Sequence, residues 1–141
     1  MKPNILRSLF TAAALAPLLI GCASAPMTGG APVQFNGDTL VNKAGMTLYA
    51  YDKNAGGKSA CTGQCTTNWP PLMAAATDKG GNDFSVIARE DGARQWAYDG
   101  KPLYTWSKDQ KPGDMTGDNF NKVWHAVKKL APIQQPGGGG Y

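Results

Sequence analysis

"GMTLYAYDKN" (residues 45–54) and "GKPLYTWSKD" (residues 100–109) are two versions of one pattern within a chain of 141 residues. In each, a glycine is followed at the same intervals by Leu-Tyr, a second aromatic residue, a lysine and finally Asn or Asp. The offset between them is 100 − 45 = 55 positions, and it also takes Trp69 onto Trp124 without a gap. The chain therefore contains a tandem repeat.

The two copies span about residues 38–72 and 84–127, and both have the periodicity of β-strands. Apolar and aromatic side chains alternate along "LYAY" and "LYTW", which is typical of a strand with two different faces. Other segments with the composition of strands begin at Thr39, Phe84, Arg94 and Val123. After the first 22 residues the sequence has no long amphipathic helical period, and residues 60–68 suggest a single helical turn.

One unit of this size buries too little apolar surface to be stable alone. We therefore predict an all-β fold, in which a small single domain consists of two related antiparallel β units about a pseudo-twofold axis, with long loops. We also predict that each repeated strand packs on the tryptophan that ends its own loop. Tyr51 would then contact Trp69, and Trp106 would contact Trp124.

Residues 1–21 have the pattern of a bacterial signal peptide. Lys2 and Arg7 precede the uncharged run "SLFTAAALAPLLI", which is too short to cross a bilayer as a mature helix. The run ends in "LIGC", which resembles the lipobox of bacterial lipoproteins. That resemblance implies that Cys22 becomes the acylated first residue of the mature chain. The alternative is an ordinary secretory signal followed by a chance cysteine.

The remaining boundaries follow from composition. Residues 22–37 are rich in Gly, Pro and Ala and predict a flexible tether. Residues 38–132 would form the tandem-repeat domain, and residues 133–141 a disordered tail. The expected location is the bacterial cell envelope, where the acylated Cys22 anchors the protein in the membrane. In a Gram-negative host this would be the outer membrane, because the cysteine is followed by alanine rather than aspartate.

Charge and cysteine usage narrow the classes of partner. Without Lys2 and Arg7, 14 − 2 = 12 basic side chains stand against 10 acidic ones, and they are scattered. This argues against nucleic acid as a partner, because phosphate binding needs a concentrated basic surface. Cys61 and Cys65, in "CTGQC", lie in a compartment that permits disulfides, and we predict that they form one. Redox use of this pair is the alternative.

The aromatic residues of the repeats have two interpretations. They either form the core, or some of them line a groove and stack on sugar rings or an extended peptide. Asn54 and Asp109 either cap the turns after their strands or accept hydrogen bonds from a ligand. The complete set of candidate ligand-facing residues is Tyr49, Tyr51, Asn54, Trp69, Tyr104, Trp106, Asp109, Trp124 and His125.

A lipobox followed by tandem "LY-x-aromatic" motifs, with "WPP" and "VWH" after them, resembles a family of bacterial lipoproteins built from secreted repeats. The family is described by a Y-x-(F/W/Y)-x-x-D motif. "YTWSKD" (residues 104–109) matches it in full, whereas "YAYDKN" (residues 49–54) ends in Asn. The family has no agreed activity, so the resemblance implies a fold and a location rather than a mechanism.

Two functions remain open from the sequence. The first is a non-enzymatic envelope lipoprotein that binds an unidentified ligand, such as an envelope glycan or a protein. The second is a redox or metal-handling lipoprotein that uses Cys61 and Cys65, or His125 with Met46, Met73 or Met115. We expect no cofactor, no metal and no catalytic residue for the first.

Overall fold

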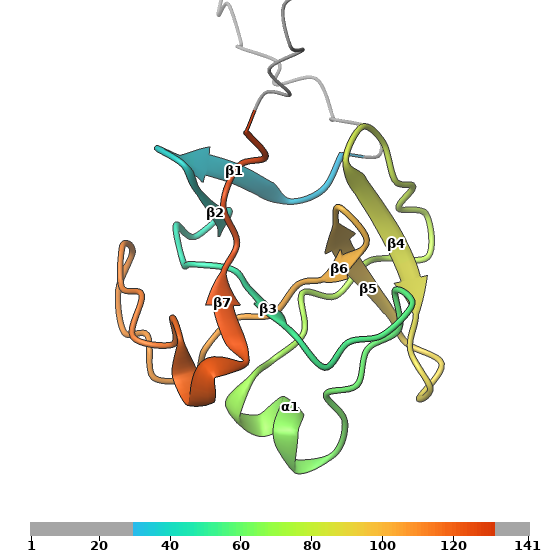
Figure 1. Cartoon of the computed structure of the whole chain (residues 1–141). Helices are drawn as coiled ribbons and strands as arrows, with labels where there is room; N and C mark the ends of the chain where they lie inside the picture. Colours follow the sequence, from blue (N-terminus) through green and yellow to red (C-terminus); the bar gives the residue numbers. More distant parts are fainter. Residues whose placement is uncertain (1–29, 132–141) are drawn as a thin grey trace, which may run out of the picture.

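The computed structural model describes residues 30–131, and this part of the chain is all-β apart from one short helix and one 3₁₀ turn. The antiparallel strands confirm the predicted fold class, as Figure 1 shows. In chain order the elements are β1 (Val33–Asn36), β2 (Thr39–Asn42), β3 (Tyr49–Tyr51), α1 (Gln64–Asn68), β4 (Phe84–Ala88), β5 (Arg94–Tyr98), β6 (Lys101–Pro102), the 3₁₀ turn η1 (Phe120–Lys122) and β7 (Trp124–Ala126).

The strands form three small antiparallel sheets. β1 pairs with β2, β4 with β5 and β5 with β6, so these sheets each lie within one part of the chain. The third sheet joins the two copies of the repeat, because β3 of the first pairs with β7 of the second, Tyr49 opposite Ala126 and Tyr51 opposite Trp124. The first part of the domain is thus tied to its last part.

A pseudo-twofold axis passes between the two motif tyrosines. Tyr49 N donates to Tyr104 O at 2.8 Å, and Tyr104 N donates to Tyr49 O at 3.0 Å. The flanking main-chain bonds obey the same symmetry, Val127 N to Leu48 O and Leu72 N to Leu103 O, both 2.9 Å. The offset of 55 residues in the sequence is therefore a rotation in space.

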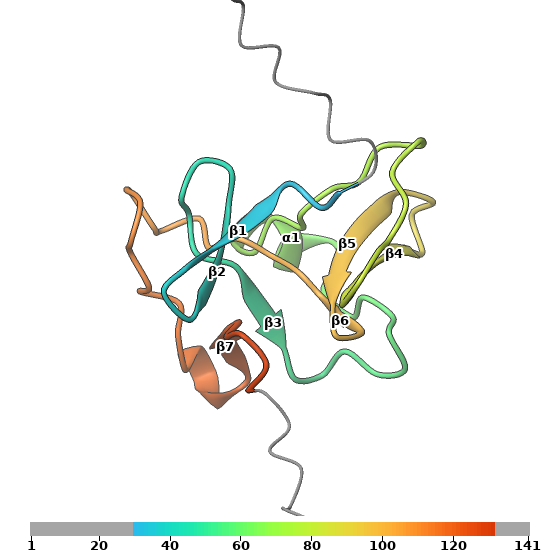
Figure 2. The same ribbon diagram turned by 90° about the horizontal axis from the view of Figure 1, so that it is seen from above.

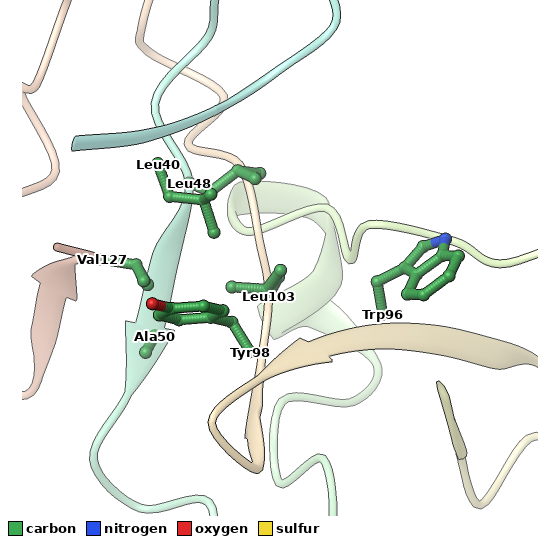
Figure 3. Close-up of a cluster of buried hydrophobic side chains, with 7 residues drawn as sticks. All are labelled: Leu40, Leu48, Ala50, Trp96, Tyr98, Leu103 and Val127. Atoms are coloured by element: carbon green, nitrogen blue, oxygen red, sulfur yellow. The ribbon is translucent and has the colours of Figure 1, made fainter. Parts of the chain in front are cut away.

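Strand alternation divides the buried side chains into two clusters. One face of the repeated strands carries aliphatic residues into a cluster shown in Figure 3: Leu40, Leu48, Ala50, Trp96, Tyr98, Leu103 and Val127. The other face carries aromatic residues into a second cluster, formed by Tyr49, Cys61, Trp69, Tyr104, Trp106, Trp124 and Ala126. Both clusters draw on both repeats, so neither repeat has a core of its own.

The predicted tether extends too far towards the C-terminus, because its last residues form a strand. Residues 22–37 were assigned to it, yet residues 33–36 form β1, which pairs with β2 through Val33 opposite Asn42. The ring of Phe35 lies 5.9 Å from that of Tyr98, edge to face. The predicted signal peptide, Cys22 and the C-terminal tail lie outside the described residues. Within residues 30–131, no helix has the length and hydropathy needed to cross a membrane.

Candidate functional site

Four aromatic rings form a stacked column at the centre of the second cluster. Trp124 stacks on Trp69 with 3.8 Å between ring centroids, Tyr51 stacks on Trp124 at 4.3 Å, and Trp106 stacks on Trp69 at 4.0 Å. The predicted pairing within each repeat is therefore wrong. Tyr51 and Trp106 each stack on the tryptophan of the other repeat, because β3 pairs with β7 and residues 69–71 lie beside Tyr104.

Burial removes most of the aromatic residues from any binding surface. Tyr49 and Tyr104 are fully buried, and Trp69, Trp106 and Trp124 are at most 5% exposed. The two tyrosines meet Trp69 and Trp124 edge to face, with centroids 5.4 and 5.2 Å apart. The ligand-facing interpretation is wrong for these five residues, which form the core.

The last residue of each motif holds the first tyrosine of the other repeat. Tyr49 Oη donates to Asp109 Oδ2 at 2.7 Å, and Tyr104 Oη donates to Asn54 Oδ1 at 3.4 Å. Burial, followed by the hydrogen bond to Asp109, raises the pKa of Tyr49 well above its ordinary range. Asp109 and Asn54 also accept hydrogen bonds from main-chain N–H groups of their own loops, which is the capping role that the sequence suggested. Asp109 Oδ1 accepts from Thr116 N at 3.0 Å and Asn54 Oδ1 from Ala60 N at 2.8 Å.

Cys61 and Cys65 form the predicted disulfide. A buried guanidinium from the second repeat holds the loop around it: Arg89 donates to the Cys61 carbonyl at 2.9 Å and to Ser59 Oγ at 2.6 Å. In the second repeat the position of Cys65 is taken by Phe120, since 120 − 65 = 55. The Phe120 ring lies 4.9 Å from that of Trp106 and packs against the end of the column.

In the loop of residues 109–119, the Asp114 and Asp118 carboxylates accept hydrogen bonds from main-chain N–H groups. Asp114 Oδ2 accepts from Gln110 N and Lys111 N, and Asp118 Oδ1 accepts from Ala126 N at 2.8 Å. These oxygens close the loop. Across residues 30–131, no three His, Cys, Asp or Glu side chains are grouped so that they could hold a metal ion.

A groove of about 440 Å³ lies between the β3–β7 pair and the turn from β5 to β6. Its apolar part is formed by Ala50, Val127 and Leu130, with the largely buried Tyr98. Tyr98 Oη accepts a hydrogen bond from Leu130 N at 3.2 Å, which holds the segment after β7 over the groove. The polar lining residues are Asp52, Asn54, Asp99, Lys101, His125 and Lys128.

His125 and Asp52 form an ion pair, or a neutral hydrogen bond, across the two repeats. Their Nε2 and Oδ2 atoms are 2.9 Å apart, and about half of each side chain is exposed. Asp99 lines the same groove. The Met115 sulfur accepts weak hydrogen bonds from Thr39 Oγ1 and Lys128 Nζ, at 3.9 and 3.8 Å. The contacts of His125 and Met115 therefore do not form a metal site together.

The charged residues of this groove break the symmetry of the repeats. Under the 55-residue offset, the uncharged equivalents of the groove residues are Ser107 for Asp52, Met46 for Lys101, Pro70 for His125 and Met73 for Lys128. The buried equivalents, by contrast, are Leu for Leu, Tyr for Tyr and Trp for Trp. These four positions thus differ in charge between the repeats, while two other groove residues, Asn54 and Tyr98, have the charged equivalents Asp109 and Lys43.

Of the sequence-predicted residues, the groove includes Tyr51, Asn54 and His125. It also includes Asp52, Lys101 and Lys128, which sequence reasoning did not single out. A comparison of the two copies for charges without a charged equivalent would have found them. Strand alternation directs the Tyr51 ring into the aromatic column, away from the face that carries Ala50 and Asp52.

A family model described as a secreted repeat of unknown function matches residues 34–73 and 85–128, which are the two repeats. No curated protein matches the chain. No solved structure matches it either.

Proposed function

This chain belongs to the family of secreted repeats of unknown function, and we propose that it is a lipid-anchored, non-enzymatic binding module of the bacterial cell envelope. Its ligand is an envelope glycan held in the groove between the β3–β7 pair and the β5–β6 turn. The observation that supports this is the placement of charge. Asp52, Lys101, His125 and Lys128 gather at one groove, whereas the equivalent positions of the other repeat are uncharged.

The lining of the groove fits a sugar of one or two rings. A volume of about 440 Å³ is within the range of small-ligand sites. The apolar part around Ala50 and Val127 suits the C–H faces of a pyranose, and the Asp52 carboxylate accepts hydrogen bonds from hydroxyls. Lys101 adds a cation for a carboxylate-bearing sugar.

The redox and metal-handling alternative is not proposed. The Cys61 and Cys65 sulfurs are bonded to each other, and the loop that contains them is closed by Arg89. Within residues 30–131, His125 belongs to no group of three His, Cys, Asp or Glu side chains that could hold a metal ion. Membrane attachment is proposed from "LIGC" at residues 19–22, so Cys22→Ser should leave the protein unprocessed or released. A processed, membrane-retained variant would contradict it.

The groove is tested by NMR titration of the ¹⁵N-labelled domain with a soluble N-acetylglucosamine–N-acetylmuramic acid disaccharide. We expect chemical-shift changes at residues 50–54, 98–101 and 125–130. The variants Asp52→Ser and Lys101→Met replace each residue by its equivalent in the other repeat, Ser107 and Met46. Each should weaken binding by about tenfold, because a hydrogen bond to a charged group contributes about 1.5–3 kcal/mol.

Lys58→Met is the matched control, since Lys58 is exposed and does not line the groove. Equal affinity of the control and the unchanged protein is expected. Shifts that fall outside the groove, or variants that bind as well as the control, would refute the assignment of the groove to a glycan.

A further inference from the structure

β4 is the edge strand of the sheet β4-β5-β6, on the outer side of β5 in Figures 1 and 2. Its register with β5 follows from two bonds, Arg89 N to Ala93 O and Asp99 N to Asp83 O, both 2.8 Å. In an antiparallel ladder, alternate residues exchange main-chain hydrogen bonds with the partner strand. The odd-numbered residues therefore bond to β5, and Phe84, Val86 and Ala88 direct their N–H and C=O groups to the outer edge.

Only the first of these outward positions has a partner in the described part of the chain. Phe84 exchanges both bonds with Gly81, at 3.0 and 2.9 Å. The outward N–H and C=O groups of Val86 and Ala88 have no hydrogen-bond partner within residues 30–131. Edge strands are usually protected by lysine, proline or a covering segment. The sequence of β4, "FSVIA", has neither lysine nor proline.

We propose that β4 pairs with β4 of a second copy of this protein, antiparallel and with a twofold axis at Ile87. In this register Val86 of each copy lies opposite Ala88 of the other. Each copy contributes two N–H and two C=O groups, so the pairing makes 2 + 2 = 4 hydrogen bonds and uses every group of the edge that has no partner within residues 30–131. The two Ile87 side chains face each other, with Cβ atoms about 4.5–5.5 Å apart. Gly81, already bonded to Phe84, blocks longer overlap.

A second copy is the expected partner because the described part of the chain begins, at Gly30, close to β4. Gly30 and Ala31 line one surface hollow with Gly80, Gly81 and Phe84, so the N-terminal segment starts beside β4. From Cys22 to Gly30 there are eight residue steps, which span at most about 28 Å. This step rests on the proposed acylation of Cys22. An anchored copy then carries β4 within this distance of the bilayer, at the same height as its neighbours.

Confinement to one membrane also supplies the concentration that a small interface needs. Four main-chain bonds and one isoleucine pair are too few to hold a dimer in dilute solution, but they suffice where anchoring makes the second encounter nearly intramolecular. The resulting sheet is continuous across both copies, in the order β6-β5-β4-β4-β5-β6. Both grooves stay open, because β3 and β7 take no part in the pairing.

The test is cross-linking of Ile87→Cys in the full-length protein in membranes, with a mild oxidant and non-reducing electrophoresis. We expect a disulfide-linked species of twice the mass as the main product. Thr77→Cys, exposed on the loop before β4, is the control and should remain largely monomeric. Equal cross-linking of both variants, or a main product with another polypeptide, would overturn the proposal.

A second variant separates pairing from folding. Ala88→Pro removes an N–H that faces outwards, so the ladder with β5 keeps its bonds at Ile87 and Arg89. Added to Ile87→Cys, it should abolish the cross-link while the circular dichroism spectrum stays unchanged. If the protein is released from membranes, acylation has failed, and the pairing is then tested on the purified protein at high concentration. A cross-link that survives the proline with the fold intact would refute the pairing of β4.

Discussion

In the first repeat the motif ends at Asn54, and a disulfide from Cys65 closes the loop. In the second repeat the motif ends at Asp109, and Phe120 takes the place of Cys65 against the aromatic column. The loops between have equal lengths and unlike sequences. Two different closures thus hold the same geometry, in which each tyrosine hydroxyl reaches the acceptor of the other repeat.

The comparison shows which positions the framework constrains. Trp69 and Trp124 each contact rings from both copies, so neither can change without loss on both sides of the axis. Exposed side chains do not contact the cores of both repeats in this way. Asp52 and Lys101 are therefore free to differ from Ser107 and Met46, and the two repeats place different charges around the groove. Buried positions that are the same in both repeats therefore indicate the structural framework, and exposed positions that differ between the repeats are candidates for function.

The largest expected effect comes from removing the centre of the column. Trp69→Ala and Trp124→Ala should each lower the free energy of unfolding by about 3–5 kcal/mol, because a large buried ring leaves a cavity. A small domain has about 5–15 kcal/mol in total, so both variants should melt far below the unchanged protein. Thermal unfolding followed by circular dichroism measures this.

Lys79→Ala is the matched control, since Lys79 is exposed on the loop before β4. The crossed arrangement adds a sharper requirement. Trp69→Ala should disturb the environment of Trp106 at least as much as that of Tyr51, which is visible in the aromatic NMR signals. A disturbance of Tyr51 alone would contradict the crossed stacking and favour contacts within each repeat.

The crossed arrangement itself could not be predicted from spacing. Tyr51 precedes Trp69 by the same interval that separates Trp106 from Trp124, because both follow the 55-residue offset. Equal intervals are compatible with contact inside each repeat and with exchange between repeats. The choice depends on the pairing of β3 with β7, a long-range contact that no local pattern encodes.

The strands and the disulfide were predictable because their signals are local. Alternation placed β3, β4 and β5, and the five-residue span of Cys61 to Cys65 suited a closed turn. β1 was missed because Val33 and Phe35 follow a segment rich in glycine and proline, although they alternate as a strand does. The groove was missed because it joins three segments that are distant in sequence.

The next effect compares the two buried hydroxyls. Tyr49 donates to a carboxylate, whereas Tyr104 donates to the neutral Asn54 and shares a further hydrogen bond with the neutral Ser59 hydroxyl. Tyr49→Phe should therefore cost about 1.5–3 kcal/mol and Tyr104→Phe about 0.5–1.5 kcal/mol of unfolding free energy. Urea unfolding at pH 7 measures both. Equal costs would show that the Asn–Asp difference between the repeats has no energetic consequence.

The same pair predicts a dependence on alkaline pH. Tyr49 has an ordinary pKa of 10.0, and burial with the bond to Asp109 raises the pKa of the folded state. A raised pKa gives stability that is complete below pH 10 and is lost as the pH rises towards the folded value. Tyr49→Phe should flatten the decline of stability above pH 10. A variant that declines as steeply as the unchanged protein would contradict this.

A smaller difference is expected between the two loop closures. Replacing both Cys61 and Cys65 by Ala should cost about 2 kcal/mol, from the loop entropy that a ring this short restores to the unfolded chain. Phe120→Ala should cost on the order of 1 kcal/mol, because 37% of the residue is already exposed. Chemical denaturation of the two variants, side by side, gives both values. A larger cost at Phe120 would make it the stronger of the two closures.

The smallest effect tests whether the first repeat can be made to match the second. Asn54 Nδ2 is buried and has no hydrogen-bond partner among residues 30–131, whereas Asn54 Oδ1 accepts from Ala60 N and Tyr104 Oη. Asn54→Asp removes the unpaired donor and supplies a stronger acceptor, so we expect a gain of about 0.5–1 kcal/mol. The gain should be present at pH 7 and vanish in acid, where the new carboxylate is protonated. Destabilisation at pH 7 would show that the nearby Asp52 and Asp99 carboxylates outweigh the stronger bond, and that the groove maintains the difference between the repeats.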